Sequence, residues 1–329
     1  MDGAPMRSYL ALSLAFVSVF AVSCGQDRDS ALAPQPRTTT VVPGLASDGS
    51  TPPAAAGALS REGCEVKPTP PGDGGSLKDQ QGPYYQQVVV ARSTDGVTVT
   101  GEKQVLEHAG VPDGVQLANG SVYIYYVNGA RHGLDVAVVQ GEGVKELGPI
   151  WLDGIERPMG VVDPDATLLA DGRVRLAYFS GFGPPSQASR TSTMCLADSE
   201  DGIHFTVVGR AIAFTELTTD PSITRLSDGT WLMAVSQGQK TVLARSKDGL
   251  NFEQYSSVTY GGVPEISALA DGRVRLYVCA RGIESYLSSD SGVTWRFEAT
   301  VIRAQPVKRI RCDPSVVPGA NLFIFKWAD

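Results

Sequence analysis

Residues 162–178, V-D-P-D-A-T-L-L-A-D-G-R-V-R-L-A-Y, predict two β-strands joined by a tight turn at Asp171 and Gly172. Asp-Gly between two apolar runs is a strong hairpin signal, because the turn needs residues that tolerate a positive φ. Pro164 opens the first run, and Gly172 follows it by eight residues. The stretch therefore predicts a hairpin with a proline near its start.

This proline hairpin recurs along the chain. Three further copies keep the spacing of eight residues between proline and turn glycine: Pro112 and Gly120, Pro221 and Gly229, and Pro264 and Gly272. A fifth, imperfect copy begins at Asp313 and Pro314 and has a shorter turn at Pro318 and Gly319. The five prolines lie 43 to 57 residues apart. A repeat of about that length with four strands per unit is typical of a β-propeller blade.

A second kind of hairpin alternates with the first. Its turn has the form Ser-x-Asp-Gly or Ser-x-Asp-x-Gly and occurs at residues 93–96, 199–202, 246–249 and 288–292, with a degenerate copy at 141–143. The Asp side chain caps such a turn, and the glycine supplies positive φ. These turns resemble the Asp-box of sialidases and related β-propellers. Residues 288–295 match its full form, and residues 199–205 and 246–252 match the shorter form common in five-bladed glycosidases.

The order of the hairpins predicts how the fold closes. The chain enters at an outer hairpin, residues 87–105, and leaves at an inner hairpin, residues 310–326. We expect these two hairpins to complete one blade, because closure leaves no long free strand edge. Residues 83–329 are therefore predicted to form an all-β, five-bladed β-propeller of four-stranded blades, which we expect to be monomeric.

The first 23 residues have the features of a targeting segment. Arg7 precedes an apolar run of 14 residues, 9–22, which is shorter than the ~20 residues that span a bilayer. Residues 21–24, A-V-S-C, resemble a bacterial lipobox, which implies lipidation of Cys24. The alternative is an ordinary secretory signal peptide. Gly25 after the cysteine favours the outer membrane or the cell surface as the location.

Residues 24–82 are rich in Pro, Gly and Ala and nearly lack aromatic residues, so we expect a disordered tether between the lipid anchor and the propeller. Cys64 is the one anomaly in it. The net charge of −7 and the scattered basic residues argue against nucleic acid as a partner. The expected partners are the membrane, through the anchor, and a glycan.

Four cysteines follow Cys24, and in an oxidising compartment they could pair in three ways or remain as buried thiols. The predicted strands favour one pair. Cys312 lies at the start of an inner strand, and Cys279 lies at the end of the second strand of the preceding blade. We therefore expect that these two could form a disulfide.

Acidic residues flank the five prolines. The position before the proline holds Asp163, Asp220 and Asp313 in three repeats and valine, Val111 or Val263, in the other two. The position after it holds Asp113, Asp165 and Glu265, or serine. Residues two apart in a strand share a face, so both positions are predicted to face the central channel. Glycoside hydrolysis needs two such carboxyls.

The Asp-Pro strand starts resemble those of inverting five-bladed glycosidases of the arabinanase and β-xylosidase type. The resemblance implies Asp163 as general base, Asp220 as the residue that tunes the pKa, and Glu265 as general acid. It leaves Asp113, Asp165 and Asp313 as substrate contacts. One departure is that the family's Glu usually stands two residues before the proline, where this chain has Gly262; Glu156 and Glu216 are other candidates. The alternative is that each Asp only caps local amides at a strand start.

Other functions are weighed against this one. One alternative is a sialidase-like site, which binds a substrate carboxylate with three arginines. Arg131, Arg157 and Arg311 are placed where some could reach the channel, but they form no clear triad. The chain has no nucleophile elbow, P-loop or zinc motif. A calcium ion in the central channel is the one cofactor that the sequence leaves open. A non-catalytic propeller that binds glycan or protein at the cell surface is the other class, favoured if loops or apolar residues plug the channel mouth.

Overall fold

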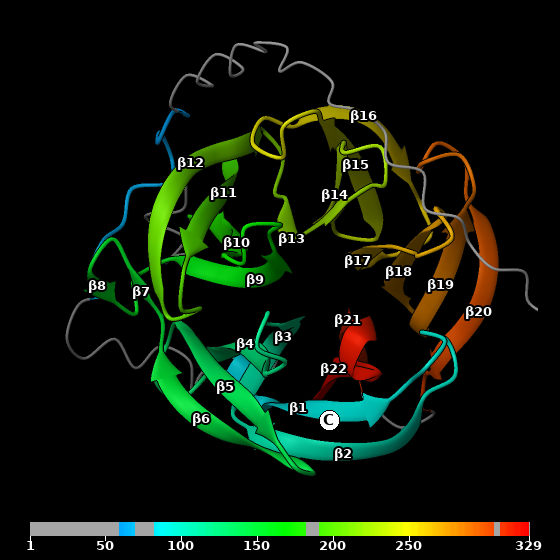
Figure 1. The fold of residues 1–329 in the computed structure, drawn as a ribbon, viewed down its shortest axis with the longest axis horizontal. Coiled ribbons are helices and arrows are strands. Elements are labelled where there is room, and N and C mark those ends of the chain that lie inside the picture. The colour runs from blue at the N-terminus through cyan, green and yellow to red at the C-terminus, as the bar shows by residue number, and fades with distance from the viewer. Residues whose placement is uncertain (1–58, 70–81, 182–190, 306–309, 329) are drawn as a thin grey trace, which may run out of the picture. The chain divides into compact units, whose positions relative to one another are not determined.

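The computed structural model describes residues 59–69, 82–181, 191–305 and 310–328. It is an all-β structure whose only helices in these ranges are two single 3₁₀ turns, η2 Pro83–Tyr85 and η3 Pro318–Ala320. Among the described residues, no helix is long and apolar enough to cross a bilayer. The strands form five sheets arranged around a central axis (Figure 1), so the predicted five-bladed β-propeller is confirmed.

We name the blades A to E in chain order of their inner strands. Blade A contains β3 Ala109–Gln116, β4 Val122–Asn128, β5 Leu134–Gln140 and β6 Gly143–Pro149. Blade B contains β9 Val161–Leu168, β10 Val174–Ser180, β11 Ser192–Ser199 and β12 His204–Phe214, and the small hairpin β7 Trp151–Leu152 and β8 Ile155–Glu156 extends its outer edge. Blade C contains β13 Thr219–Arg225, β14 Trp231–Gln237, β15 Lys240–Ser246 and β16 Glu253–Val258.

Blade D contains β17 Gly262–Ala268, β18 Val274–Ala280, β19 Gly282–Ser288 and β20 Arg296–Arg303. Blade E is built from both ends of the folded chain and contains β21 Ile310–Val317, β22 Leu322–Ala328, β1 Gln86–Arg92 and β2 Thr100–Glu107. In it β1 pairs with β22, with Val89 opposite Phe325. The predicted closure of the ring by the first outer hairpin and the last inner hairpin is therefore confirmed.

The second strand of each blade supplies most of the core. In β10, β14 and β18, six of the seven residues are buried. Such a strand is covered on both faces by the neighbouring blades, which is why its sequence is an almost continuous apolar run rather than an alternating one. Apolar clusters consequently fill the seams between blades, for example Leu176 and Tyr178 against Tyr125.

Each inner strand has an irregularity at its proline. The pairing register shifts between Ala177 and Phe179, opposite Pro164, and at the corresponding place in all four other blades. Proline has no N–H to give to the ladder, so a bulge is the expected result. The residue before each proline has a positive φ: Val111 49°, Asp163 53°, Asp220 50°, Val263 47° and Asp313 51°.

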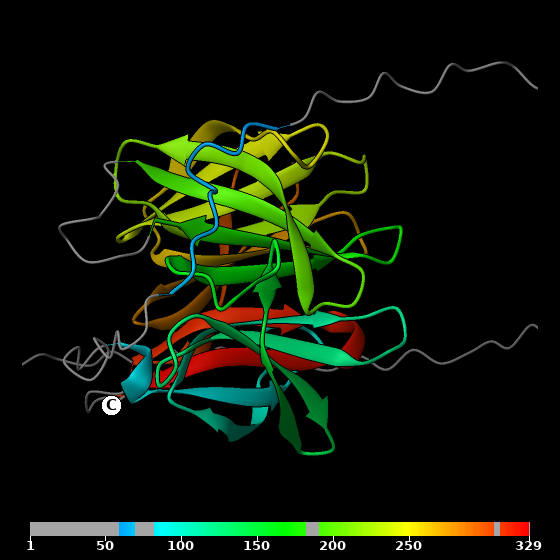
Figure 2. The ribbon, with the colours of Figure 1, turned by 90° about the vertical axis from the view of Figure 1, so that its left-hand side faces the viewer.

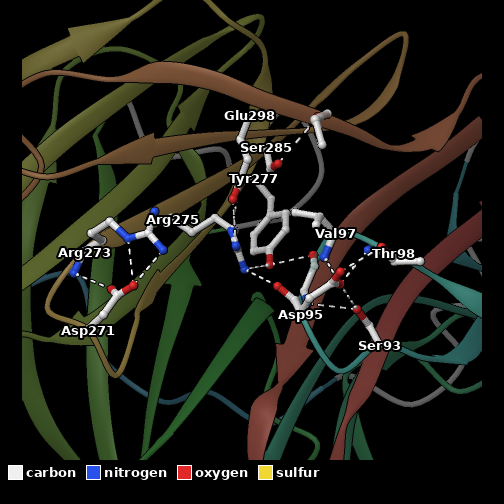
Figure 3. A network of polar contacts seen from close by, with 12 residues as sticks. Ser93, Asp95, Val97, Thr98, Asp271, Arg273, Arg275, Tyr277, Ser285 and Glu298 are labelled. Atoms are coloured by element: carbon white, nitrogen blue, oxygen red, sulfur yellow. Dashed lines mark hydrogen bonds and ion pairs between the residues drawn. The ribbon is translucent and has the colours of Figure 1, made fainter. Parts of the chain in front are cut away.

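The Ser-x-Asp turns join the third strand of a blade to the fourth, for example β15 to β16. In the turn that includes Asp248, this carboxylate accepts hydrogen bonds from the amides of Leu250 and Asn251 at 2.8 and 3.0 Å. In another of these turns, a side chain of the preceding blade binds the backbone. Figure 3 shows Arg275 Nη1, which donates a hydrogen bond to the carbonyl of Asp95 at 2.8 Å. These turns therefore join neighbouring blades.

Residues 59–69 run along the outside of blade B (blue in Figure 2) and are held to it by a disulfide between Cys64 and Cys195 on β11. Arg61 also pairs with Asp153 at 2.5 Å. These residues lie inside the range 24–82, for which the sequence predicts a disordered tether; residues 24–58 and 70–81 lie outside the described part. A second disulfide joins Cys279 to Cys312, the pair that the sequence favours, and links blade D to blade E.

Candidate active site

Nine of the ten residues that flank the five prolines line one small cavity on the propeller axis, with a volume of about 30 Å³. We call the residues before the prolines the mouth ring and those after them the deep ring. The mouth ring is Val111, Asp163, Asp220, Val263 and Asp313. The deep ring is Asp113, Asp165, Ser222, Glu265 and Ser315. The expectation that the acids of both positions face the channel is met, since all six line the cavity.

The deep ring is a belt of hydrogen bonds between blades. Four of its five side chains accept an amide of the next blade: Asp113 that of Ala166 at 2.7 Å, Asp165 that of Ile223 at 3.1 Å, Ser222 that of Ile266 at 3.0 Å, and Ser315 that of Gly114 at 3.0 Å. Glu265 also accepts the hydroxyl of Ser222 at 2.8 Å. The acids therefore cap amides, as the alternative to catalysis supposes, but amides of the neighbouring blade rather than local ones.

The deep-ring carboxyls hold their protons strongly. Burial raises the pKa of Asp113 to about 7, although the Ala166 amide and the Ser315 hydroxyl act in the opposite direction. Burial, followed by the charge of Asp113, raises the pKa values of Asp165 and Glu265 well above their usual range. Oxygen atoms of these three acids lie within 4.8 Å of one another, so they are the group that could hold a hard cation such as calcium.

In the mouth ring, three carboxyls from blades B, C and E meet one lysine. Asp163 Oδ2 accepts the amide of Asp220 at 3.3 Å, and Asp313 Oδ2 accepts the amide of Val111 at 3.2 Å. Lys326, which comes from β22, pairs with Asp313 Oδ2 at 2.7 Å. Asp163 and Asp220 are partly exposed, whereas every acid of the deep ring is buried, so the mouth ring is the part of the channel that a ligand can reach.

The mouth-ring acids also have raised pKa values. Burial and then the charge of Asp220 raise the pKa of Asp163 well above its usual range, and burial and then the charge of Asp313 raise the pKa of Asp220 to about 6. Burial lowers the pKa of Lys326, but the attraction of Asp313, Asp220 and Asp163 outweighs it and leaves that pKa raised. A carboxyl that keeps its proton near neutral pH can donate it, so this environment suits Asp163 to the role of acid rather than base.

All three predicted catalytic residues line the cavity, but they belong to different rings. Asp163 and Asp220 are neighbours in the mouth ring, whereas Glu265 lies in the deep ring with Asp113 and Asp165. The other candidate acids are outside the cavity lining: Glu156 is exposed, and Glu216 lies 3.9 Å from Lys240.

The three predicted arginines do not line the cavity either. Arg131 and Arg157 both pair with the buried Asp135, at 3.4 and 3.0 Å, and Arg311 pairs with Glu102 at 2.9 Å. Each guanidinium already pairs with a carboxylate of the protein. The structure therefore gives no support to a sialidase-like site in which these arginines bind a substrate carboxylate.

Lys326 is the site residue that sequence reasoning missed. It is the one charged residue in the otherwise apolar run of β22, L-F-I-F-K-W-A. A lone lysine in a strand that is predicted to be buried is a signal, because a buried ammonium needs an anionic partner. That signal alone does not say which acid the lysine meets.

No family model matches the chain, and no curated protein matches it in sequence. Solved structures do resemble it. They include a GH43_1 enzyme from Xanthomonas citri, with 14% identity over 67% of this chain and 86% of that one and a TM-score of 0.46. An α-L-arabinanase from Penicillium chrysogenum has 15% identity over 73% and 79%, with a TM-score of 0.46.

A fructofuranosidase from Schwanniomyces occidentalis, in complex with fructose, has 11% identity and a TM-score of 0.50. The likeness covers 70% of this chain and 52% of the fructofuranosidase, so the chain accounts for about half of that protein. At such low identity the likeness shows a shared five-bladed propeller fold, and the activity has to be argued from the residues of this chain.

Proposed function

We propose that this protein is a glycoside hydrolase whose active centre is the mouth ring. The observation that supports it is the meeting of Asp163, Asp220 and Asp313 from three blades at the accessible end of the channel, beside a single lysine. Glycosidic hydrolysis needs one carboxyl that donates a proton to the leaving oxygen and another that activates water or attacks the sugar. Several carboxyls that share one site differ in proton affinity, which separates those two roles.

The substrate class we propose is a neutral glycan of the arabinan or xylan kind, cleaved with inversion. The resemblance of the Asp-Pro strand starts supports it, and so does the charge of the site. Three acids and one lysine surround the mouth, so an anionic sugar would meet net repulsion there. The arginines that could offset this repulsion are already paired with acids.

The proposal is tested on a panel of aryl glycosides and of neutral and acidic polysaccharides, with release of reducing ends as the measurement. For a substrate that the protein cleaves, Asp163→Asn should lower turnover by about 100-fold or more, as loss of a general acid does. Glu265→Gln tests whether the deep ring takes part; we expect a smaller fall in turnover and a larger fall in stability. A loss of less than about tenfold in Asp163→Asn would exclude Asp163 as the general acid of the mouth ring.

The second candidate function is a non-catalytic propeller that binds a glycan or a protein. The size of the cavity favours it, because about 30 Å³ admits a water molecule or an ion but not a sugar ring. It also accounts for the deep-ring acids, which are occupied in holding blades together. If the wild-type protein cleaves nothing on the panel yet binds a glycan on an array, the binding function replaces hydrolysis.

We propose further that the propeller is anchored to the bacterial cell envelope through lipidated Cys24, at the outer membrane or the cell surface. The support is the position of this cysteine directly after the apolar run; it lies outside the described residues. Cys24→Ser should release the protein from the membrane fraction or block its processing, as seen by fractionation and by electrophoretic mobility. A variant that fractionates and migrates like the wild type would contradict the anchor.

A further inference from the structure

Lys326 is the only basic side chain, among the described residues, that has an ionic contact with the mouth-ring acids. Its Nζ lies 2.7 Å from Asp313 Oδ2, and the two side chains are only 14% and 3% exposed. A pair as buried as this resists separation, because either partner alone would be a desolvated charge. The ion pair therefore places one negative charge of the mouth ring on Asp313.

The two carboxylate oxygens of Asp313 have different surroundings. Oδ2 accepts both the Lys326 ammonium and the Val111 amide. Oδ1 is buried and has no hydrogen-bond partner among the described residues, and Asp313 lines the axial cavity. A buried carboxylate oxygen without a donor is costly, and a cavity of about 30 Å³ is large enough for one water molecule. Oδ1 is thus poised to bind a water.

The other mouth-ring acids are less suited to activate that water. Neither Asp163 nor Asp220 has a buried carboxylate oxygen that lacks a hydrogen-bond partner among the described residues. Burial and the charge of Asp220 also favour the protonated form of Asp163, because they raise its pKa. Asp163 stands on blade B and Asp313 on blade E, and blade A, which contributes Val111, lies between them. Inverting enzymes hold base and acid about 6.5–9.5 Å apart to leave room for a water, so two acids from blades that are not adjacent suit these roles better than the neighbours Asp163 and Asp220.

We propose that Asp313 is the catalytic base of this site, that its Oδ1 binds the attacking water, and that Lys326 is the residue that positions it. This inference rests on the proposed hydrolase function. Asp313 takes a proton from the water as the water oxygen bonds to the anomeric carbon. The glycosidic C–O bond breaks, and the leaving oxygen takes the proton of Asp163. Asp313 then returns its proton to solvent and Asp163 regains one.

The first experiment distinguishes base from acid. Asp313→Gly should lose about 100-fold or more of its turnover, and added azide should restore part of it by taking the place of the water and giving a glycosyl azide of inverted configuration. Asp163→Gly should keep most of its turnover on dinitrophenyl glycosides, whose leaving group needs no proton, and should not respond to azide. The opposite pattern would overturn the assignment.

The second experiment tests Lys326. Lys326→Met should move the acidic limb of the pH profile of kcat by about one pH unit or more, while Lys326→Arg keeps the wild-type limb. Lys103→Met is the matched control, because it removes a lysine from the same blade that pairs with Glu142 away from the channel. If Lys326→Met misfolds, the double variant Lys326→Met with Asp313→Asn removes both charges and should fold. A pH profile unchanged in Lys326→Met would contradict the positioning role.

The third measurement needs no substrate. A high-resolution crystal structure of the wild-type protein should show an ordered water within hydrogen-bond distance of Asp313 Oδ1 in the axial cavity. No water beside Oδ1 would overturn the inference even if the enzyme is active. If the water is present but no glycoside is cleaved, the proposed function fails, and the catalytic role of Asp313 fails with it.

Discussion

The central channel and the Ser-x-Asp turns both use aspartate side chains, but their surroundings shift the pKa of the carboxyl in opposite directions. In both, an Asp carboxylate accepts backbone amides: Asp248 those of its own turn, and Asp113 that of the next blade. Burial alone would raise the pKa of Asp248, but the amides of Asn251 and Leu250 outweigh it and lower this pKa to about 2. In Asp113 burial dominates and the pKa rises to about 7.

The difference lies in solvent and in neighbouring charge. The turn aspartates are surface groups, so water still solvates the charged form while the amides stabilise it further. The channel acids converge from several blades on one small cavity, where water is scarce and like charges are close. Turn aspartates therefore serve the fold, and channel acids keep a reactivity that a hydrolase could use.

The largest expected difference between the regions is in catalysis. Asp220→Asn should lower turnover by about tenfold or more on any glycoside that the protein cleaves, because it alters the charge beside Asp163. Asp248→Asn, which keeps an oxygen to accept the turn amides, should leave turnover within about twofold of wild type. Steady-state kinetics of both variants provides the check, and equal losses would remove the functional distinction between the two regions.

The two regions should also affect the pH dependence of stability in opposite ways: the turn acids lose their contribution at low pH, and the channel acids lose theirs as the pH rises. The folded pKa of Asp248 is lowered to about 2, so its contribution is present above its usual pKa of 3.8 and is lost as the pH falls through about 2. The folded pKa of Asp113 is raised to about 7, so its contribution is present below 3.8 and is lost as the pH rises through about 7.

Thermal unfolding between pH 2 and pH 9 tests both effects. We expect the melting temperature to fall by about 5 °C or more between pH 4 and pH 7.5, and Asp113→Asn to flatten that fall. Asp248→Asn should flatten the acidic limb instead. A melting temperature that rises steadily up to pH 8.5 would show that the channel acids are ionised in the folded protein, for example around a bound cation.

The smallest effect concerns the two mouth-ring positions without an acid. Val263 has a φ of 47°, which a β-branched residue rarely adopts, whereas Asp and Asn tolerate this region. Val263→Asn should therefore raise the free energy of unfolding by up to about 1 kcal/mol through relief of strain. Urea unfolding measures it, with Val258→Asn on an ordinary strand as the control that should destabilise. A destabilised Val263→Asn would show that apolar packing outweighs the strain.

Much of the fold was predictable from the sequence because its signals are local and repeated. Pro164 with Gly172, and the turn after Ser246, each specify a short hairpin, and five copies of such hairpins specify the number of blades. The first and the last hairpin of the propeller each supply half a blade, which predicts the pairing of β1 with β22. The sequence also indicated the Cys279–Cys312 pair, because both positions follow from strand ends.

What only the tertiary structure decided is how side chains from different blades meet. The bulge at each proline divides the channel acids into two rings, and so separates Glu265 from Asp163. Lys326 and Asp313 lie on adjacent strands of one hairpin, but they come near Asp163 and Asp220 only when the ring is closed. Cys64 meets Cys195 only after residues 59–69 cross blade B. Local sequence sets the strands and turns, but burial and charge at the axis depend on five blades that are distant along the chain. The partners and proton affinities of the site are therefore properties of the closed ring.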